Sequence, residues 1–407
     1  MRILQINIFF DEGSTGKIVA DIHNRLLRDG HDSYVIYGLG HDETVKDPKY
    51  EYKITTNSIA KWRGRWTRII GLRYNCASSS TEKAIELIKR INPDVVHLHC
   101  LNCFYINPFK LLKWLGKNDI PVLVTHHADV TITANCDHSY SCEKWRTGCS
   151  FHCSTAKKQL HSKLWQFSKF SWLQMKAAFD AVPRLYASGV SRWMADRVKA
   201  SPMFEKRECR IIENGLDTSS FHYQKEAGRL KQEFGYSPLE RLILYVTPNL
   251  LAPIKGGKYV MELARQMTDV NFIIVGAKGS VPFDIPKNVR IVHHVSSKQE
   301  LAKYYSMADL TLLTSQKESF SMVTAESLCC GTPVVGFKAG APETISILEY
   351  SEFVDYGDTD TLKNVLYKWL AIDINKDAVS KIAILRYDAE RMYEGYLNYY
   401  GHINETI

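Results

Sequence analysis

The sequence predicts an α/β protein made of two doubly wound parallel sheets, each with its own core. Short apolar runs alternate with segments of helical spacing along the whole chain, which is typical of parallel sheets covered by helices. The 407 residues are about two domains' worth of chain, and no stretch approaches the roughly 20 apolar residues that cross a bilayer. We expect one domain at 1–185, a second at 186–375, and a helical segment at 376–407 that packs back toward the first.

The first predicted domain opens with a strand at 3–8, followed by the turn Gly13-Ser-Thr-Gly16 and a helical pattern that Gly30 ends. The backbone can approach a phosphate or a sugar at such a glycine turn, although many of these turns only connect two elements. His127 follows a later strand at 122–125, and a histidine there either packs in the core or faces a ligand. Other strands of this domain are predicted at 33–37, 95–99 and 185–188, and a helix at 81–90.

Four cysteines lie close together after the 122–125 strand, namely Cys136, Cys142, Cys149 and Cys153. Soft thiolates at short loop spacing are typical zinc ligands, and His138 or His152 could replace one of them. Reduced thiols and a disulfide pair are the alternatives. The N-terminal stretch lacks the pattern of a signal peptide, so we expect a cytoplasmic protein with reduced cysteines.

The formal charge of +8 favours an anionic partner, which could be a nucleoside diphosphate, an anionic lipid or a nucleic acid. Two acid-free stretches, 61–75 and 157–176, mix lysines and arginines with aromatic residues. Such a mixture suits the surface of a membrane, but the same aromatics could simply fill the core. Neither stretch contains a recognisable nucleic-acid-binding motif, so no nucleic-acid partner is expected.

The second predicted domain contains strands at 242–246, 272–276, 289–292 and 310–313, with helices at 259–267 and 301–307. Lys255 stands beside two glycines in the loop after the first of these strands, where a lysine can reach a diphosphate or can be an ordinary surface residue. A further helix begins near Ser321. Gly331 supplies its left-handed cap, Pro333 stops it, and another strand opens at Val334.

Glu318 and Glu326 stand on either side of the start of this helix. Ligands bind beyond the carboxyl ends of parallel strands, and the backbone amides at 319–323 could bind an anion with help from the helix dipole. Carboxylates can also hold sugar hydroxyls, so the arrangement suits a sugar nucleotide. Two unrelated surface glutamates are the alternative interpretation.

The stretch around this helix resembles the glutamate–seven–glutamate signature of the family 4 retaining glycosyltransferases. The matching residues are Glu318, Phe320, Glu326, Gly331, Thr332, Pro333 and Val334. Asn214-Gly-Leu-Asp217 and Gly340-Ala-Pro-Glu343 match further family segments. The bacterial transferases of colanic-acid, capsule and exopolysaccharide synthesis are the most similar subgroup, and they carry a similar cysteine-rich loop.

The resemblance implies the GT-B fold, in which two Rossmann-like domains face each other across a cleft. It also implies transfer of a sugar from a nucleoside diphosphate to a hydroxyl of a lipid-linked saccharide acceptor, with retention of configuration and no cofactor required for catalysis. Glu318 and His127 would be catalytic. The donor would contact Gly16, Asn249, Lys255, Ser319, Phe320, Ser321, Met322, Val323 and Glu326. The expected location is the cytoplasm, at the inner face of the cell membrane.

Three positions depart from the family pattern. Ser321 stands where the family commonly has glycine, Ala128 where the subgroup has an acid after the histidine, and Leu250 where the family has an arginine. Lys255 would therefore act with neutral donors instead of a second cation. These departures keep open a non-catalytic sugar-binding scaffold as an alternative function, with a nucleic-acid-binding protein as a weaker one.

Overall fold

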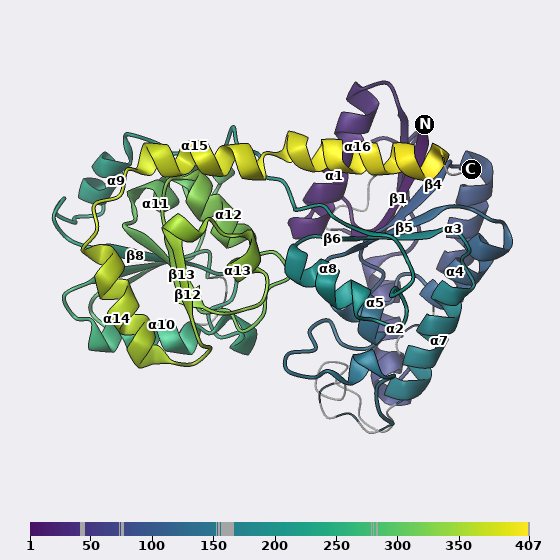
Figure 1. Ribbon diagram of the computed structural model, residues 1–407, viewed down its shortest axis with the longest axis horizontal. Helices are drawn as coiled ribbons and strands as arrows, with labels where there is room; N and C mark the ends of the chain where they lie inside the picture. Colours follow the sequence, from purple (N-terminus) through teal and green to yellow (C-terminus); the bar gives the residue numbers. More distant parts are fainter. Residues whose placement is uncertain are drawn as a thin grey trace. The chain divides into compact units, whose positions relative to one another are not determined.

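The computed structural model describes residues 1–40, 45–72, 74, 77–151, 153, 155, 167–277, 279, 281 and 284–405. The chain forms two compact units, which we call unit 1 (residues 1–212 and 393–407) and unit 2 (residues 213–392). Each unit contains one parallel sheet with helices packed against it (Figure 1). The predicted fold class of two Rossmann-like domains is confirmed. Among the helices of the described residues, none is both long and apolar enough to cross a membrane.

Unit 1 has a seven-stranded sheet in the order β3-β2-β1-β4-β5-β6-β7. The strands are β1 (Arg2–Phe9), β2 (Asp32–Leu39), β3 (Glu51–Lys53), β4 (Val95–Leu98), β5 (Val122–His126), β6 (Leu185–Gly189) and β7 (Cys209–Ile211). All neighbouring strands pair in parallel. The strand order reverses direction between β1 and β4, and ligands bind beyond the carboxyl ends of strands at such a point.

The helices of unit 1 are α1 (Gly13–Arg28), α2 (Asn57–Ile70), α3 (Ser78–Ile91), α4 (Pro108–Lys117), α5 (Val130–Thr133), η1 (Lys144–Arg146), α7 (Ser168–Asp180), α8 (Arg192–Lys199) and most of α16 (Ala389–Glu405). Gly13-Ser-Thr-Gly16 was predicted as a turn before α1, but it is the first turn of that helix. Gly16 packs against β1, since a Cβ there would lie 3.2 Å from the backbone oxygen of Phe9.

Unit 2 has a six-stranded parallel sheet in the order β10-β9-β8-β11-β12-β13, with its reversal between β8 and β11. Its strands are β8 (Leu242–Val246), β9 (Asn271–Val275), β10 (Val289–Val292), β11 (Leu310–Leu313), β12 (Val334–Phe337) and β13 (Ser351–Val354). Its helices are α9 (Ala227–Glu233), η2 (Pro253–Lys255), α10 (Gly257–Gln266), α11 (Lys298–Met307), α12 (Met322–Cys329), α13 (Pro342–Ile345), η3 (Leu348–Tyr350), α14 (Thr359–Leu370) and α15 (Lys376–Tyr387).

The units divide at residue 212, later than the expected boundary at 185, because β6 and β7 both extend the first sheet. The segment 376–407 is also shared between the units. Helix α15 stays with unit 2, where the Ser380 hydroxyl donates to the backbone oxygen of Cys329 on α12. Unit 1 takes the chain from Tyr393 onward.

Four buried tyrosines attach α16 to unit 1. Each hydroxyl is hydrogen-bonded: Tyr393 to Asp29 (2.7 Å), Tyr396 to Thr125 (3.1 Å), Tyr399 to the backbone oxygen of Ala187 (3.2 Å) and Tyr400 to Nδ1 of His97 (2.6 Å). His97 and Tyr400 are both fully buried. A buried polar group costs free energy when it loses its partner, so these bonds fix how the last helix packs.

We predict that Tyr400→Phe lowers the free energy of unfolding by about 1–3 kcal/mol, because Nδ1 of the buried His97 loses its partner. Urea unfolding measures this change. Tyr34→Phe is the matched control, since the Tyr34 hydroxyl makes no hydrogen bond within the described residues, and it should be nearly neutral. Equal stability of wild type and Tyr400→Phe would contradict the anchoring role.

Candidate functional site

An ion pair joins the carboxyl ends of two neighbouring strands in unit 2. Lys255 follows β8 and Glu318 follows β11, and these strands pair in parallel, so both loops leave the same edge of the sheet. The Lys255 Nζ lies 2.7 Å from Oε1 of Glu318. The side chains are 32% and 18% exposed, so a ligand can reach both. The predicted donor residues Lys255 and Glu318 are thus in contact.

The backbone around Lys255 is held against β11. Its carbonyl oxygen accepts hydrogen bonds from the Tyr245 hydroxyl (2.6 Å) and from Oγ1 of Thr314 (3.0 Å). The next residue, Gly256, has a φ of +71°, and a Cβ there would lie 2.1 Å from the backbone oxygen of Thr314. Only glycine fits this left-handed position. The backbone of Lys255 is therefore held in one position at this edge of the sheet.

The backbone of Glu318 is held by the turn that the sequence matched as Gly340-Ala-Pro-Glu343. The Glu318 amide donates to the oxygen of Ala339 (2.9 Å), and its carbonyl accepts from the amide of Ala341 (3.2 Å). The Glu343 carboxylate in turn accepts from the amide of Gly340 at 2.9 Å. Glu343 is therefore a positioning residue for Glu318, a role that the sequence did not indicate.

Helix α12 begins at Met322, in agreement with the start predicted near Ser321. Ser321 is its N-cap, with a φ of +79°, and the Ser321 hydroxyl accepts from the amide of Thr324. A left-handed conformation costs a residue with a Cβ roughly 1–2 kcal/mol, so the protein tolerates strain where the family commonly has glycine. The amides of Met322 and Val323 in the first turn have no acceptor inside the helix and are available to an anion.

Glu326 lies in the second turn of α12, half-buried, where its carboxylate accepts a hydrogen bond of 2.9 Å from the buried Tyr305 hydroxyl. Burial, with Glu326 next in importance, raises the pKa of Tyr305 well above its usual value, so the phenol remains a donor. Asn249 is exposed, and its side-chain oxygen accepts from the amide of Leu251 at 3.1 Å. Leu250 is buried in the core of unit 2, so the position where the family has an arginine faces away from the edge of the sheet.

His127 of unit 1 belongs to a directed chain of hydrogen bonds. The Gln5 amide nitrogen donates to the backbone oxygen of Val19 (3.3 Å), so its oxygen faces Nε2 of His99 (3.1 Å) as an acceptor. His99 Nε2 must then carry the proton. Because His99 is neutral, its Nδ1 accepts the hydrogen bond of 3.1 Å from Nε2 of His127. This order leaves the lone pair of His127 on Nδ1.

Burial lowers the pKa of His127 to about 4, so the ring is neutral near pH 7 and acts as a hydrogen-bonding group rather than a cation. The Asp129 carboxylate, two residues further along the chain, binds Arg197 (3.0 Å) and the Ser139 amide (2.7 Å). His99 is a partner that sequence reasoning missed. It is 28 residues away along the chain, and only the pairing of β4 with β5 brings the two together.

Comparison with known proteins identifies the family. A model described as Glycosyltransferase Family 4 matches residues 15–220, which is half of the chain, and a second model, Glycosyl transferases group 1, matches residues 240–371. The chain belongs to glycosyltransferase family 4. The first match covers His127 in unit 1, and the second covers Lys255, Glu318 and Glu326 in unit 2.

Individual relatives of this glycosyltransferase agree with the family assignment. A protein of Escherichia coli (strain K12) named for colanic acid biosynthesis, the glycosyl transferase WcaC, is 22% identical over 99% of this chain and 100% of its own length. The N-acetyl-alpha-D-glucosaminyl L-malate synthase of Bacillus anthracis is 26% identical over 85% of this chain and 82% of its own.

Solved structures agree on the fold. Sucrose-phosphate synthase from Thermosynechococcus elongatus has a TM-score of 0.70 at 14% identity, and both chains are covered completely. Anabaena Alr3699/HepE in complex with UDP has a TM-score of 0.65 at 15% identity, covering 99% of this chain and 100% of its own. The fold of the glycosyltransferase is therefore GT-B.

The four cysteines predicted as zinc ligands, Cys136, Cys142, Cys149 and Cys153, line one small cavity in unit 1. Burial, followed by the neighbouring Cys153 and Cys142, raises the pKa of Cys149 to about 12. In the described part of the chain, however, no three or more His, Cys, Asp or Glu side chains are gathered closely enough to hold a metal ion. His152 lies outside the described residues. The structural zinc remains a prediction, and it requires the loop to tighten around the ion.

We predict that the purified glycosyltransferase contains one zinc ion bound by this cysteine cluster, because zinc would stabilise the thiolates that burial now disfavours. Elemental analysis measures the metal, and a chelator should release it together with four newly titratable thiols. Cys136→Ser should lower the zinc content, whereas Cys209→Ser, outside the cluster, should not. Metal-free protein with four accessible thiols would exclude the site.

We also predict that acid destabilises unit 1 through its buried histidines. Burial lowers the pKa of His126 to about 3 and those of His23 and His127 to about 4, while an unfolded histidine titrates near 6.5. Below pH 6.5 these histidines bind protons in the unfolded chain but remain unprotonated in the folded chain. The free energy of unfolding should fall with decreasing pH, by up to about 1.4 kcal/mol per pH unit for each histidine, until about pH 4.

Urea unfolding at several pH values between 7 and 4.5 measures this slope. His126→Phe should have a shallower slope than wild type, whatever its stability at pH 7, because one of the titrating groups is gone. An unchanged slope would mean that His126 takes up protons equally in the folded and unfolded states.

Proposed function

We propose that this protein is a retaining glycosyltransferase that moves a sugar from a nucleoside diphosphate sugar to a hydroxyl of a saccharide acceptor. The observation that carries the proposal is the Lys255–Glu318 pair beside the start of α12. The cation and the unused helix amides at this sheet edge match the diphosphate of the donor, which leaves with negative charge. The carboxylate matches the sugar hydroxyls. UDP in the HepE structure supports a nucleotide donor.

Lys255 changes partner when the donor binds. In the structure its ammonium pairs with Glu318 at 2.7 Å. A diphosphate carries more negative charge than one carboxylate, so the lysine turns toward the diphosphate and Glu318 becomes available to sugar hydroxyls. The amides at Met322 and Val323 then bind the opposite side of the phosphate. The position where the family has an arginine is occupied by the buried Leu250, so that position supplies no second cation.

The reaction breaks the bond between the anomeric carbon and the diphosphate oxygen, the acceptor oxygen forms the new bond on the same face, and the hydroxyl proton passes to the departing diphosphate. Lys255 and the amides stabilise the departing diphosphate, while the Glu318 carboxylate stabilises the positive charge that develops on the sugar. Neutral His127 would contact the sugar as a hydrogen-bonding group rather than as a cation. Glu326 would hold the ribose, and the Tyr305 hydroxyl orients its carboxylate.

The acceptor is a lipid-linked saccharide in the synthesis of a bacterial surface polysaccharide, and the enzyme works at the inner face of the cell membrane. The name of the WcaC relative, with its full-length match, supports this role. Two residues of the predicted basic and aromatic stretch 157–176, Phe170 and Leu173, are exposed on α7, whereas Trp172 is buried. Residues 157–166 lie outside the described structure.

We predict that Glu318→Gln abolishes sugar transfer while the protein remains folded, since the amide keeps the shape and loses the charge. Lys255→Ala should weaken binding of the nucleoside diphosphate about 10- to 150-fold, corresponding to about 1.5–3 kcal/mol for one charge-assisted hydrogen bond. Calorimetry with UDP, GDP and ADP measures the affinity, and release of nucleotide from the matching sugar donors measures turnover.

Lys303→Ala is the matched control, because Lys303 is an exposed lysine of unit 2 on α11, and it should change neither quantity. Near wild-type turnover of Glu318→Gln would remove its proposed role. Donor binding by wild type without any nucleotide release, whatever the acceptor, would favour the non-catalytic scaffold.

A further inference from the structure

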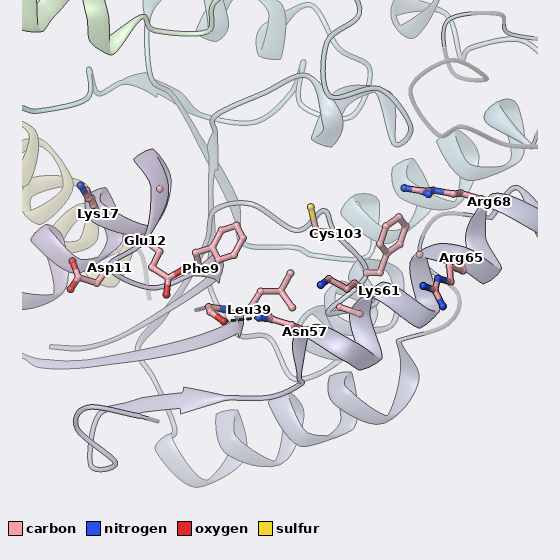
Figure 2. Close-up of a pocket in the computed structure, with 15 residues that line it drawn as sticks. Phe9, Asp11, Glu12, Lys17, Leu39, Asn57, Lys61, Arg65, Arg68 and Cys103 are labelled. Atoms are coloured by element: carbon pink, nitrogen blue, oxygen red, sulfur yellow. Dashed lines mark hydrogen bonds between the residues drawn. The ribbon is translucent and has the colours of Figure 1, made fainter. Parts of the chain in front are cut away.

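A large cavity lies in unit 1, at the carboxyl ends of β1 and β2. Its volume is about 900 Å³, and it is bounded by the first turn of α1 on one side and by α2 on the other (Figure 2). Phe9 and Leu39 line its floor, where β1 and β2 end. Neither the ion pair of unit 2 nor His127 contributes to this lining, so the cavity has no role yet in the proposed reaction.

Three cations line one end of the cavity, and two carboxylates together with one lysine line the other. Lys61, Arg65 and Arg68 enter it from α2, spaced so that all three lie along one face of the helix (Figure 2). Within the described residues none of these three side chains makes an ion pair or a hydrogen bond. Asp11, Glu12 and Lys17 line the other end, where β1 leads into α1, and the Asp11 carboxylate pairs with Nζ of the exposed Lys46 at 2.8 Å. The cavity therefore offers unpaired cations at one end and carboxylates at the other.

The orientation of α2 is fixed by its inner face. Arg63 is buried and donates to the Ser80 hydroxyl (2.8 Å) and the backbone oxygen of Phe104 (3.3 Å). The Asn57 amide, at the start of the helix, donates to the backbone oxygen of Gly40 (2.7 Å) at the end of β2. These contacts turn the three cations into the cavity and the next face of the helix toward solvent.

That outer face is apolar. We call it the α2 stripe: Ile59, Trp62, Trp66 and Ile69, which are 46%, 57%, 44% and 41% exposed. Their spacing keeps them on one side of the helix, and the rings of Trp62 and Trp66 are 5.9 Å apart. Helix α2 contains no acidic residue. An exposed apolar face beside a row of cations is the pattern of a helix that lies in the surface of an anionic membrane.

We propose that this cavity binds the phosphorylated saccharide headgroup of a membrane-held acceptor while the α2 stripe lies in the lipid surface. Lys61, Arg65 and Arg68 hold the phosphate at the membrane end, and the carboxylates of Asp11 and Glu12 hold sugar hydroxyls at the other. The proposal rests on the proposed transferase function and specifies its acceptor as a lipid phosphate rather than a free sugar phosphate. The α2 stripe selects this source, because a free sugar phosphate would use the cations but would leave the exposed apolar face without a partner.

The cavity and the stripe can be tested separately. Calorimetry with dibutyryl phosphatidic acid, a water-soluble phosphate monoester, measures the affinity of the cavity for a lipid phosphate. Co-sedimentation with phosphatidylcholine vesicles, with and without phosphatidic acid, measures membrane attachment. We expect wild type to bind the soluble lipid and the anionic vesicles but not pure phosphatidylcholine.

Four variants distinguish the parts. Lys61→Gln/Arg65→Gln/Arg68→Gln should weaken vesicle binding on the order of a hundredfold, about fivefold per cation, and abolish binding of the soluble lipid. Trp62→Ser/Trp66→Ser should no longer bind vesicles but should still bind the soluble lipid. Leu39→Trp, which fills the cavity, should still bind vesicles but should no longer bind the soluble lipid. Lys113→Gln/Lys117→Gln/Lys206→Gln removes three exposed cations elsewhere in unit 1 and should change neither measurement.

Three results would overturn the proposal. Binding of the soluble lipid without vesicle binding would mean a soluble phosphorylated acceptor, and vesicle binding without binding of the soluble lipid would leave the cavity without a phosphate ligand. A dimer in analytical ultracentrifugation that Trp62→Ser/Trp66→Ser dissociates would mean that a second copy covers the stripe. UDP affinity of each folded variant separates this proposal from the transferase proposal, since Lys255→Ala should lose UDP and keep the vesicles.

Discussion

The ion pair between Lys255 and Glu318 is the contact on which the proposed function of unit 2 depends. Parallel pairing of β8 and β11 brings the two loops to one edge of the sheet, and contacts within each loop fix the positions of the two residues. Gly256 allows the lysine loop to press against β11, and the turn capped by Glu343 holds the backbone of the glutamate. A mutation of Gly256 or Glu343 would therefore displace the charged side chain of Lys255 or Glu318, although neither of those two residues is itself changed.

Much of this arrangement could be predicted from the sequence because the signals are local. The strand at 310–313, the start of α12 and the left-handed Gly331 depend on apolar periodicity, a helix cap and a proline within some twenty residues. The roles of Lys255 and Glu318 came from the family pattern rather than from spacing. Their direct contact could not be predicted, because it joins residues that are 63 positions apart.

What the sequence could not provide is the direction in which side chains point. The aromatic residues of α7 divide, with Trp172 in the core and Phe170 in solvent, although their spacing and composition are alike. In the same way, the chain from Gln5 through His99 to His127 draws on three strands and has no local signature. Composition predicted a basic and aromatic stretch near residue 61, but only the packing of Arg63 separates its cavity face from its outer face.

In the proposed donor site of this glycosyltransferase, the buried Leu250 stands where the family has an arginine, and Lys255 is paired internally with Glu318. Under the proposed function, a donor displaces this internal partner when it binds the lysine, and a ligand with both a diphosphate and a hydroxylated sugar compensates both released charges. Discrimination between ligands would then come from this exchange of partners.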